Sequence, residues 1–256
     1  MQLLKVPPKN GYIWLRQGSW LFRKNPLAIL TLLSVYLFSV LLMSILPIAG
    51  SFLPLLFIPG LSVGFMAACR DIIQKKPILP TILLEGFRNH GKITTRNLLI
   101  LGSLYIASIA CIFIFSALFD GGQLLRLMIF GAQIDSEFLA NREPMLGAML
   151  ATAVAYIPIT MLFWFAPVLV AWHEISPVKA MFFSWTACVR NSRAFIVYGL
   201  FTALVATLVP MVIGIIMLLL NLGKFLALVL MPYSIVLTAI IYCSFYASYL
   251  GCFNIQ

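Results

Sequence analysis

The chain has 256 residues, of which 62% are hydrophobic and only 9% are charged, and its formal net charge is +10. Soluble domains carry roughly 25% charged residues, so this composition excludes a water-soluble fold and predicts an integral membrane protein. The lysines and arginines lie between apolar runs, where they indicate membrane topology rather than nucleic-acid binding.

Residues 1–26 carry five basic residues and no acid. One helical face of this segment is apolar and the opposite face is polar and basic; the apolar face holds Trp14, Gly18, Leu21 and Phe22, and the polar face holds Arg16, Gln17, Arg23 and Lys24. This pattern predicts a helix in the headgroup region, with its aromatic side chains turned toward lipid. The segment lacks the continuous apolar core of a cleavable signal peptide.

Six apolar stretches are long enough to cross a bilayer, since about 20 helical residues rise about 30 Å. They cover residues 27–46, 52–69, 98–119, 145–172, 194–220 and 225–253. Prolines and glycines in the second stretch, and prolines in the last three, predict kinked or broken helices. Residues 120–143 hold four acids, and we expect them to form an external loop with one short helix at 124–130.

Two further amphipathic segments precede apolar pairs. In residues 79–90 the apolar face is Leu79, Ile82, Leu83, Gly86 and Phe87, with Thr81, Glu85, Arg88 and Asn89 opposite. In residues 176–191 the apolar face is Val178, Met181, Phe182, Trp185 and Val189, with Lys179, Thr186 and Arg190 opposite. The predicted fold is therefore all-α: six transmembrane helices in three hairpins, each preceded by an amphipathic interfacial helix.

The three amphipathic segments also suggest an internal repeat within a single membrane domain, residues 1–256. Trp20 and Phe87 are 67 residues apart and Phe87 and Trp185 are 98 apart, a difference on the order of the acidic insertion 120–143. The repeats would be residues 11–73, residues 78–119 with 144–173, and residues 177–253. The alternative is that any protein with six spans can be divided into three hairpins.

Charge sets the expected orientation. Residues 1–26, 70–96 and 173–193 hold most of the 17 lysines and arginines, so the positive-inside rule places both termini in the cytoplasm.

No span has an ionisable residue in its interior, and no nucleotide-binding, metalloprotease or serine-hydrolase motif is present. His90, His173 and Glu174 could form a metal or acid–base site, but they are more simply read as solvated helix ends. The five cysteines have no metal-binding spacing and read as packing residues. We therefore expect no enzymatic activity, no metal and no cofactor.

The basic helix ends predict contacts with anionic lipid headgroups, and the residues chosen for this are Arg23, Lys24, Arg190 and Arg193. The same charges could serve only to set topology. The leading hypothesis is a non-enzymatic inner-membrane accessory or scaffold that contacts anionic lipid or a membrane partner through its basic interfacial helices. The alternative is a transporter or channel for a small or amphipathic substrate, working through the helices broken by proline and glycine.

Short motifs at the helix boundaries carry a family resemblance: Pro177-Val178-Lys179-Ala180, Ser184, Arg190-Asn191, Tyr198-Gly199, Val6-Pro7, Gly11, Trp20-Leu21-Phe22 and Pro26. On these residues the chain resembles the BPSS type of uncharacterised proteobacterial inner-membrane proteins and, more distantly, the YciC-like membrane proteins. The resemblance implies a six-span inner-membrane fold and no assigned activity. The family pattern ends its last span with Ser-Tyr-Arg-Asp, whereas here Ser248-Tyr249 is followed by Leu250-Gly251, which puts a role for a charged pair there in doubt.

Overall fold

The structure is a computed structural model of the chain, and it describes residues 2–46, 50, 52–88, 91–122 and 142–254. The short apolar segment predicted at 124–130 lies outside the described residues. Contacts divide the chain into two units that are treated separately below. The first unit comprises residues 1–36, 64–83 and 186–256, and the second comprises residues 37–63 and 84–185.

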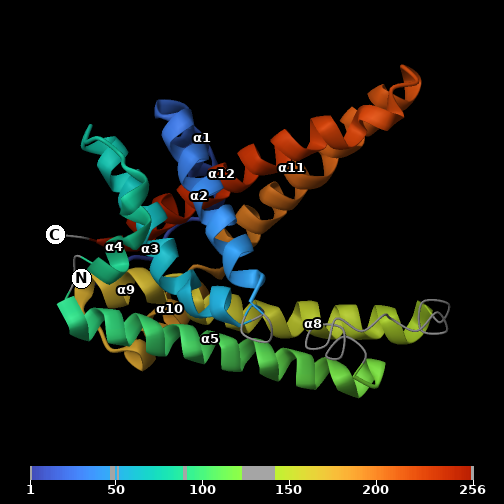
Figure 1. Cartoon of the computed structure of the whole chain (residues 1–256). Helices are drawn as coiled ribbons and strands as arrows, with labels where there is room; N and C mark the ends of the chain where they lie inside the picture. Colours follow the sequence, from blue (N-terminus) through green and yellow to red (C-terminus); the bar gives the residue numbers. More distant parts are fainter. Residues whose placement is uncertain (1, 47–49, 51, 89–90, 123–141, 255–256) are drawn as a thin grey trace. The chain divides into compact units, whose positions relative to one another are not determined.

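All six predicted spans are present as helices long and apolar enough to cross a membrane (Figure 1). They are α2 (Pro26–Ser44), α3 (Leu53–Ile73), α5 (Gly91–Asp120), α8 (Arg142–Phe163) continued by α9 (Ala166–His173), α11 (Ser192–Leu219) and α12 (Leu226–Cys252). α5 begins at Gly91, upstream of the predicted boundary, and therefore carries Lys92 and Arg96 on its first turns.

The predicted interruption is present in the fourth span, whereas the second span is not broken. α3 is one helix across Pro59, while the fourth span is interrupted between Phe163 and Ala166, after Pro158 and just before Pro167. Proline at the second position of α9 needs no backbone N–H there, so Pro167 is compatible with a new helix start.

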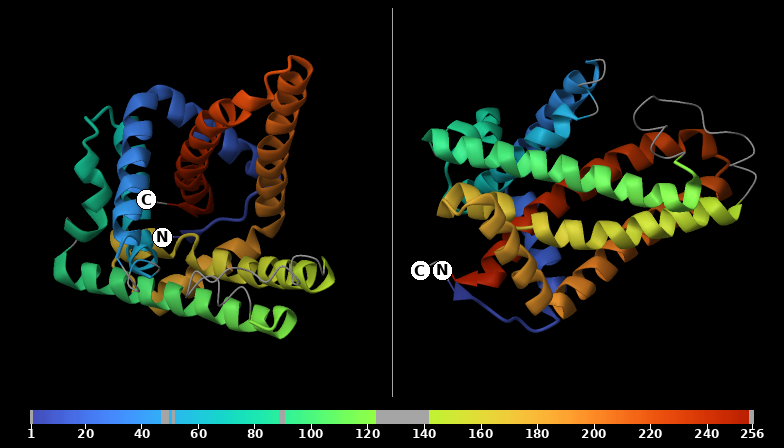
Figure 2. Two further views of the ribbon diagram at one scale, coloured as in Figure 1. Left: turned by 45° about the vertical axis from the view of Figure 1, so that its right-hand side comes forward. Right: turned by 90° about the horizontal axis from the view of Figure 1, so that it is seen from below.

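The shorter elements are α1 (Asn10–Lys24), the 3₁₀ helix η2 (Pro80–Leu84), α4 (Glu85–Arg88), α10 (Pro177–Arg190), the 3₁₀ turn η3 (Gly223–Phe225) and two strands, β1 (Gln2–Leu3) and β2 (Phe253–Asn254). β1 pairs antiparallel with β2, with Gln2 opposite Asn254. The two ends of the chain therefore lie together (Figure 2).

In the first unit, α1 packs against α12 and α11. Its buried residues are Gly11, Trp14, Gly18 and Leu21, so the predicted apolar face is confirmed. The expectation that this face turns toward lipid is wrong, because it is covered by α11 and α12. The exposed aromatic residues of α1 are Tyr12 and Trp20, at 45% and 51% exposure.

In the second unit, α5 and α8 lie side by side (Figure 1). The Tyr105 and Phe163 rings meet with their centroids 5.1 Å apart. α4 packs against α5, and the Phe87 ring lies 5.8 Å from that of Phe57 on α3. These contacts fix the short second surface segment against two spans.

The second surface segment differs from the expected helix, and the third keeps large side chains of its predicted apolar face exposed. Residues 80–88 form a 3₁₀ helix followed by one α-turn rather than one amphipathic α-helix. Glu85, expected on the polar side, is buried. In α10 the large side chains Val178 and Phe182 are exposed, at 72% and 63%, while the small residues Ala180 and Ser184 are buried. Small residues permit close helix packing, which leaves the large apolar ones available to lipid.

Candidate lipid site

Glycines seat two of the surface helices against spans of their own unit. A Cβ on Gly18 of α1 would lie 2.8 Å from the Cβ of Ser244 on α12. A Cβ on Gly86 of α4 would lie 2.9 Å from the carbonyl oxygen of Gly60 on α3. Only a residue without a side chain allows such close backbone approach. The surface helices are therefore held against protein at defined positions.

The hydroxyl of Ser184 holds α10 against the interrupted fourth span. The buried Ser184 Oγ donates to the Met161 carbonyl at 2.7 Å and accepts the Phe165 N–H at 3.0 Å. Phe165 precedes the first turn of α9, where backbone N–H groups lack intrahelical acceptors. Ser184 thus satisfies the polar backbone that the interruption of the fourth span exposes.

Asn191, directly after α10, forms hydrogen bonds to the backbone of the N-terminal segment. Its Oδ1 accepts the Val6 N–H at 2.9 Å, and its Nδ2 donates to the carbonyls of Leu4 at 3.0 Å and Ala187 at 3.1 Å. The side chain is 2% exposed. The chain entering α1 is therefore held in place, which positions that helix.

The four predicted lipid contacts are all exposed. Arg23 and Lys24 end α1, Arg190 ends α10, and Arg193 lies in the first turn of α11. Arg23 donates to Ser19 Oγ at 3.0 Å, and the Lys24 ammonium lies 5.0 Å from the centre of the Trp20 ring. In the described part of the chain no carboxylate pairs with any of the four.

The structure gathers these cations into two pairs rather than one site. Gly11, near the start of α1, packs against Ala194 of α11, so Arg190 and Arg193 lie near that end of α1. Arg23 and Lys24 lie at the other end, about 20 Å away for a helix of this length. Each pair can therefore meet a separate headgroup.

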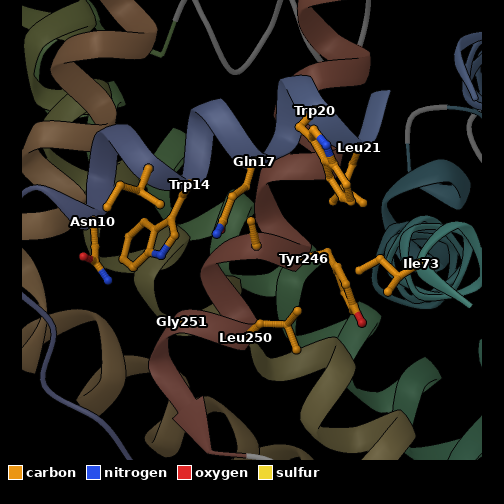
Figure 3. A pocket seen from close by; sticks show the side chains of 11 residues that line it. Asn10, Trp14, Gln17, Trp20, Leu21, Ile73, Tyr246, Leu250 and Gly251 are labelled. Atoms are coloured by element: carbon orange, nitrogen blue, oxygen red, sulfur yellow. The ribbon is translucent and has the colours of Figure 1, made fainter. Parts of the chain in front are cut away.

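A cavity of about 450 Å³ lies between α1 and the ends of α3 and α12 (Figure 3). Aromatic and aliphatic side chains form most of its wall, among them Trp14, Trp20, Leu21, Ile73, Tyr246 and Leu250. The Gln17 and Asn10 amides also line it. Its volume is in the range of small-molecule and lipid pockets.

Trp14 supplies an unusual donor to this cavity. The residue is 1% exposed, yet none of the described residues accepts a hydrogen bond from its indole N–H. Figure 3 shows the indole nitrogen on the side of the ring toward Gln17. Buried Trp N–H groups usually have an acceptor. Sequence reasoning assigned Trp14 to the aromatic belt, and no local pattern places it against α12.

A second, basic pocket of about 520 Å³ lies where α4 meets α5. Arg88, Lys92 and Arg96 line it together with Thr95, whose hydroxyl donates to the Phe87 carbonyl at 2.9 Å. These three cations were not among the predicted contacts. Lys92 and Arg96 are four residues apart, the spacing of one helical face, but they precede the apolar run that marked the span.

The histidine and acidic residues do not form a metal site in the described ranges. There, no group of three or more His, Cys, Asp or Glu residues could hold a metal ion. Asp71 pairs with Arg70 at 3.1 Å. His90 lies outside the described residues, so the interpretation of His90, His173 and Glu174 as solvated helix ends, and not as a site, stays a prediction.

Comparison with known proteins gives one strong similarity. Over its whole length the chain is 52% identical to a probable inner membrane protein of Burkholderia thailandensis, and the match covers 95% of that protein. No family model matches the chain, and no solved structure matches it.

Proposed function

We propose that this chain, which belongs to a family of proteobacterial inner-membrane proteins, has a non-enzymatic role. It holds anionic lipid headgroups through its basic surface helices. At the membrane surface it serves as a scaffold or accessory for a membrane partner. The similarity and the six apolar helices identify a multi-pass inner-membrane protein. The lipid contact and the scaffold role are the proposal.

Orientation follows from charge and from the pairing of β1 with β2. That pairing places both ends of the chain together, and the basic segments near them favour the cytoplasmic side. In this orientation Arg23, Lys24, Arg190 and Arg193 face the inner leaflet, whose surface is negatively charged.

The observation that carries the proposal is that these four cations are exposed and without an acidic partner in the described ranges, next to apolar side chains that are exposed as well. Trp20 adjoins Lys24 on α1, and the exposed Val189 directly precedes Arg190. Apolar and cationic groups side by side suit the headgroup boundary. Each cation near an anionic surface adds about 1 kcal/mol of attraction.

The test compares two quadruple variants. The first carries Arg23→Gln, Lys24→Gln, Arg190→Gln and Arg193→Gln. The control removes the same charge at exposed positions outside the surface helices: Lys5→Gln, Lys9→Gln, Lys75→Gln and Lys76→Gln. Each protein is purified in neutral detergent and given equimolar phosphatidylglycerol and phosphatidylcholine, and the bound lipid is counted by native mass spectrometry.

We expect wild type and control to retain phosphatidylglycerol preferentially, and the first variant to lose most of that preference. Equal loss in both variants would show a response to net charge alone, and unchanged retention in the first variant would refute the proposal. The transporter or channel alternative stays a prediction from the broken helices.

A further inference from the structure

We propose that the cavity between α1 and the ends of α3 and α12 binds the ester region of one membrane phospholipid, with the indole N–H of Trp14 donating to an ester carbonyl. The inference rests on the proposed lipid-binding function and names a site for it separate from the four cations. The bound group would be the glycerol-ester segment, with the first part of an acyl chain along the apolar wall.

The first argument is the donor. Trp14 is almost fully buried, yet its N–H has no acceptor among the described residues and it lines a cavity. An indole nitrogen donates one hydrogen bond and accepts none, so its partner must be an acceptor. The nitrogen is not among the fully buried polar atoms that lack a partner in the described ranges, so it is open to the cavity, where a bound acceptor can reach it.

The second argument is the lining of the cavity, which favours an ester carbonyl over a phosphate as the acceptor. Trp20, Leu21, Ile73 and Leu250 give the cavity a mostly apolar wall, and no lysine or arginine lines it. A phosphate would bring its negative charge against apolar side chains without a counter-charge. A neutral ester carbonyl needs only one donor and carries an acyl chain that suits such a wall.

The third argument is the position. The cavity lies at the ends of two membrane-spanning helices, with Ile73 at the end of α3 and Leu250 close to the end of α12. Its other wall is α1, an amphipathic helix with basic residues at its C-terminus. Such helices lie at the boundary between headgroups and acyl chains, and the ester groups of phospholipids lie at this depth.

The test compares lipids with and without the ester carbonyl that would accept a hydrogen bond from the Trp14 N–H. Phosphatidylglycerol with ester-linked chains is mixed with an equal amount of its ether-linked analogue, which has the same headgroup and chains but no carbonyl. The full-length protein in neutral detergent is titrated with the mixture, and native mass spectrometry resolves the two complexes. The proteins compared are wild type, Trp14→Phe, which removes the donor and keeps an aromatic ring, and Trp185→Phe as the matched control, since Trp185 does not line the cavity.

For wild type and Trp185→Phe we expect a preference of about three- to ten-fold for the ester lipid, the factor that one hydrogen bond contributes. Trp14→Phe should bind both lipids equally. Equal binding of both lipids by wild type, or an ester preference that survives in Trp14→Phe, would overturn the inference while leaving the role of the four cations intact. Failure of wild type to retain either phosphatidylglycerol would refute this inference and the proposed function together.

Discussion

Gly251 of α12 lies against the indole of Trp14 on α1, and a Cβ at this position would fall 2.5 Å from the indole nitrogen. The ring can therefore occupy its present position only because residue 251 has no side chain. This contact fixes the surface helix, the last span and one wall of the cavity together.

The substitution Gly251→Ala is expected to displace the Trp14 ring and to destabilise the protein. Overpacking of this kind costs about 1–3 kcal/mol, which should lower the midpoint of thermal unfolding followed by intrinsic tryptophan fluorescence in detergent. Gly199→Ala is the matched control, since Gly199 is also a helical glycine and a Cβ there would meet nothing within 4 Å. An unchanged midpoint for Gly251→Ala would mean that the indole is not confined as described.

Ser184→Ala should destabilise the interrupted fourth span. The Phe165 N–H would lose its acceptor in a buried position, at a cost of about 1–3 kcal/mol. The control is Ser103→Ala, which removes an exposed hydroxyl bonded only to the Leu99 carbonyl of its own helix. Thermal unfolding of the two variants should differ clearly, and equal midpoints would argue against the role assigned to Ser184.

Asn191→Ala should release the N-terminal segment locally. The Val6 N–H would lose its acceptor, so its hydrogen exchange, measured by mass spectrometry, should become about tenfold faster or more. Asn25→Ala serves as the control, because Asn25 is exposed and its side chain accepts a local hydrogen bond from the Ala28 N–H. If exchange at Val6 were the same in both variants, the segment would be held by other contacts.

Cys188 should resist alkylation over a wide pH range. Burial raises the pKa of its thiol, and the neighbouring Cys252 adds to the effect. A raised pKa leaves less of the reactive thiolate at any given pH, whereas an exposed thiol ionises near its usual pKa of about 8.5. Labelling of Ser192→Cys should therefore rise steeply between about pH 7 and pH 9, while labelling of Cys188 stays low until the protein is unfolded. Equal rates at the two sites would show that Cys188 is accessible.

Hydropathy and length predicted the six spans well, because each apolar run must be about as long as the bilayer is thick. The start of α5 was not predicted, because the helix begins upstream of the apolar run and its first turns carry Lys92 and Arg96. Helical spacing also identified the buried face of α1 around Trp14 and Gly18. It could not reveal that this face meets protein, because periodicity shows which side is apolar and not what covers it.

The site was less accessible to sequence reasoning. Ser184 and Asn191 act through partners in other elements, Met161 with Phe165 and Leu4 with Val6, and no spacing rule predicts such pairings. The burial of Ala180 and Ser184 in α10 was not predicted, because close helix packing in lipid favours small residues over large ones. The three-fold repeat and the single membrane domain stay predictions.

The account depends on the cationic ends of the surface helices facing the cytoplasm at the inner leaflet. Arg23→Cys and Arg193→Cys, each in the otherwise unchanged protein, test this with a membrane-impermeant maleimide. The native thiols give little background, because Cys69, Cys188, Cys243 and Cys252 are buried and Cys111 lies within a span. We predict labelling of both variants in inverted inner-membrane vesicles and none in intact spheroplasts; labelling in intact spheroplasts would contradict the account.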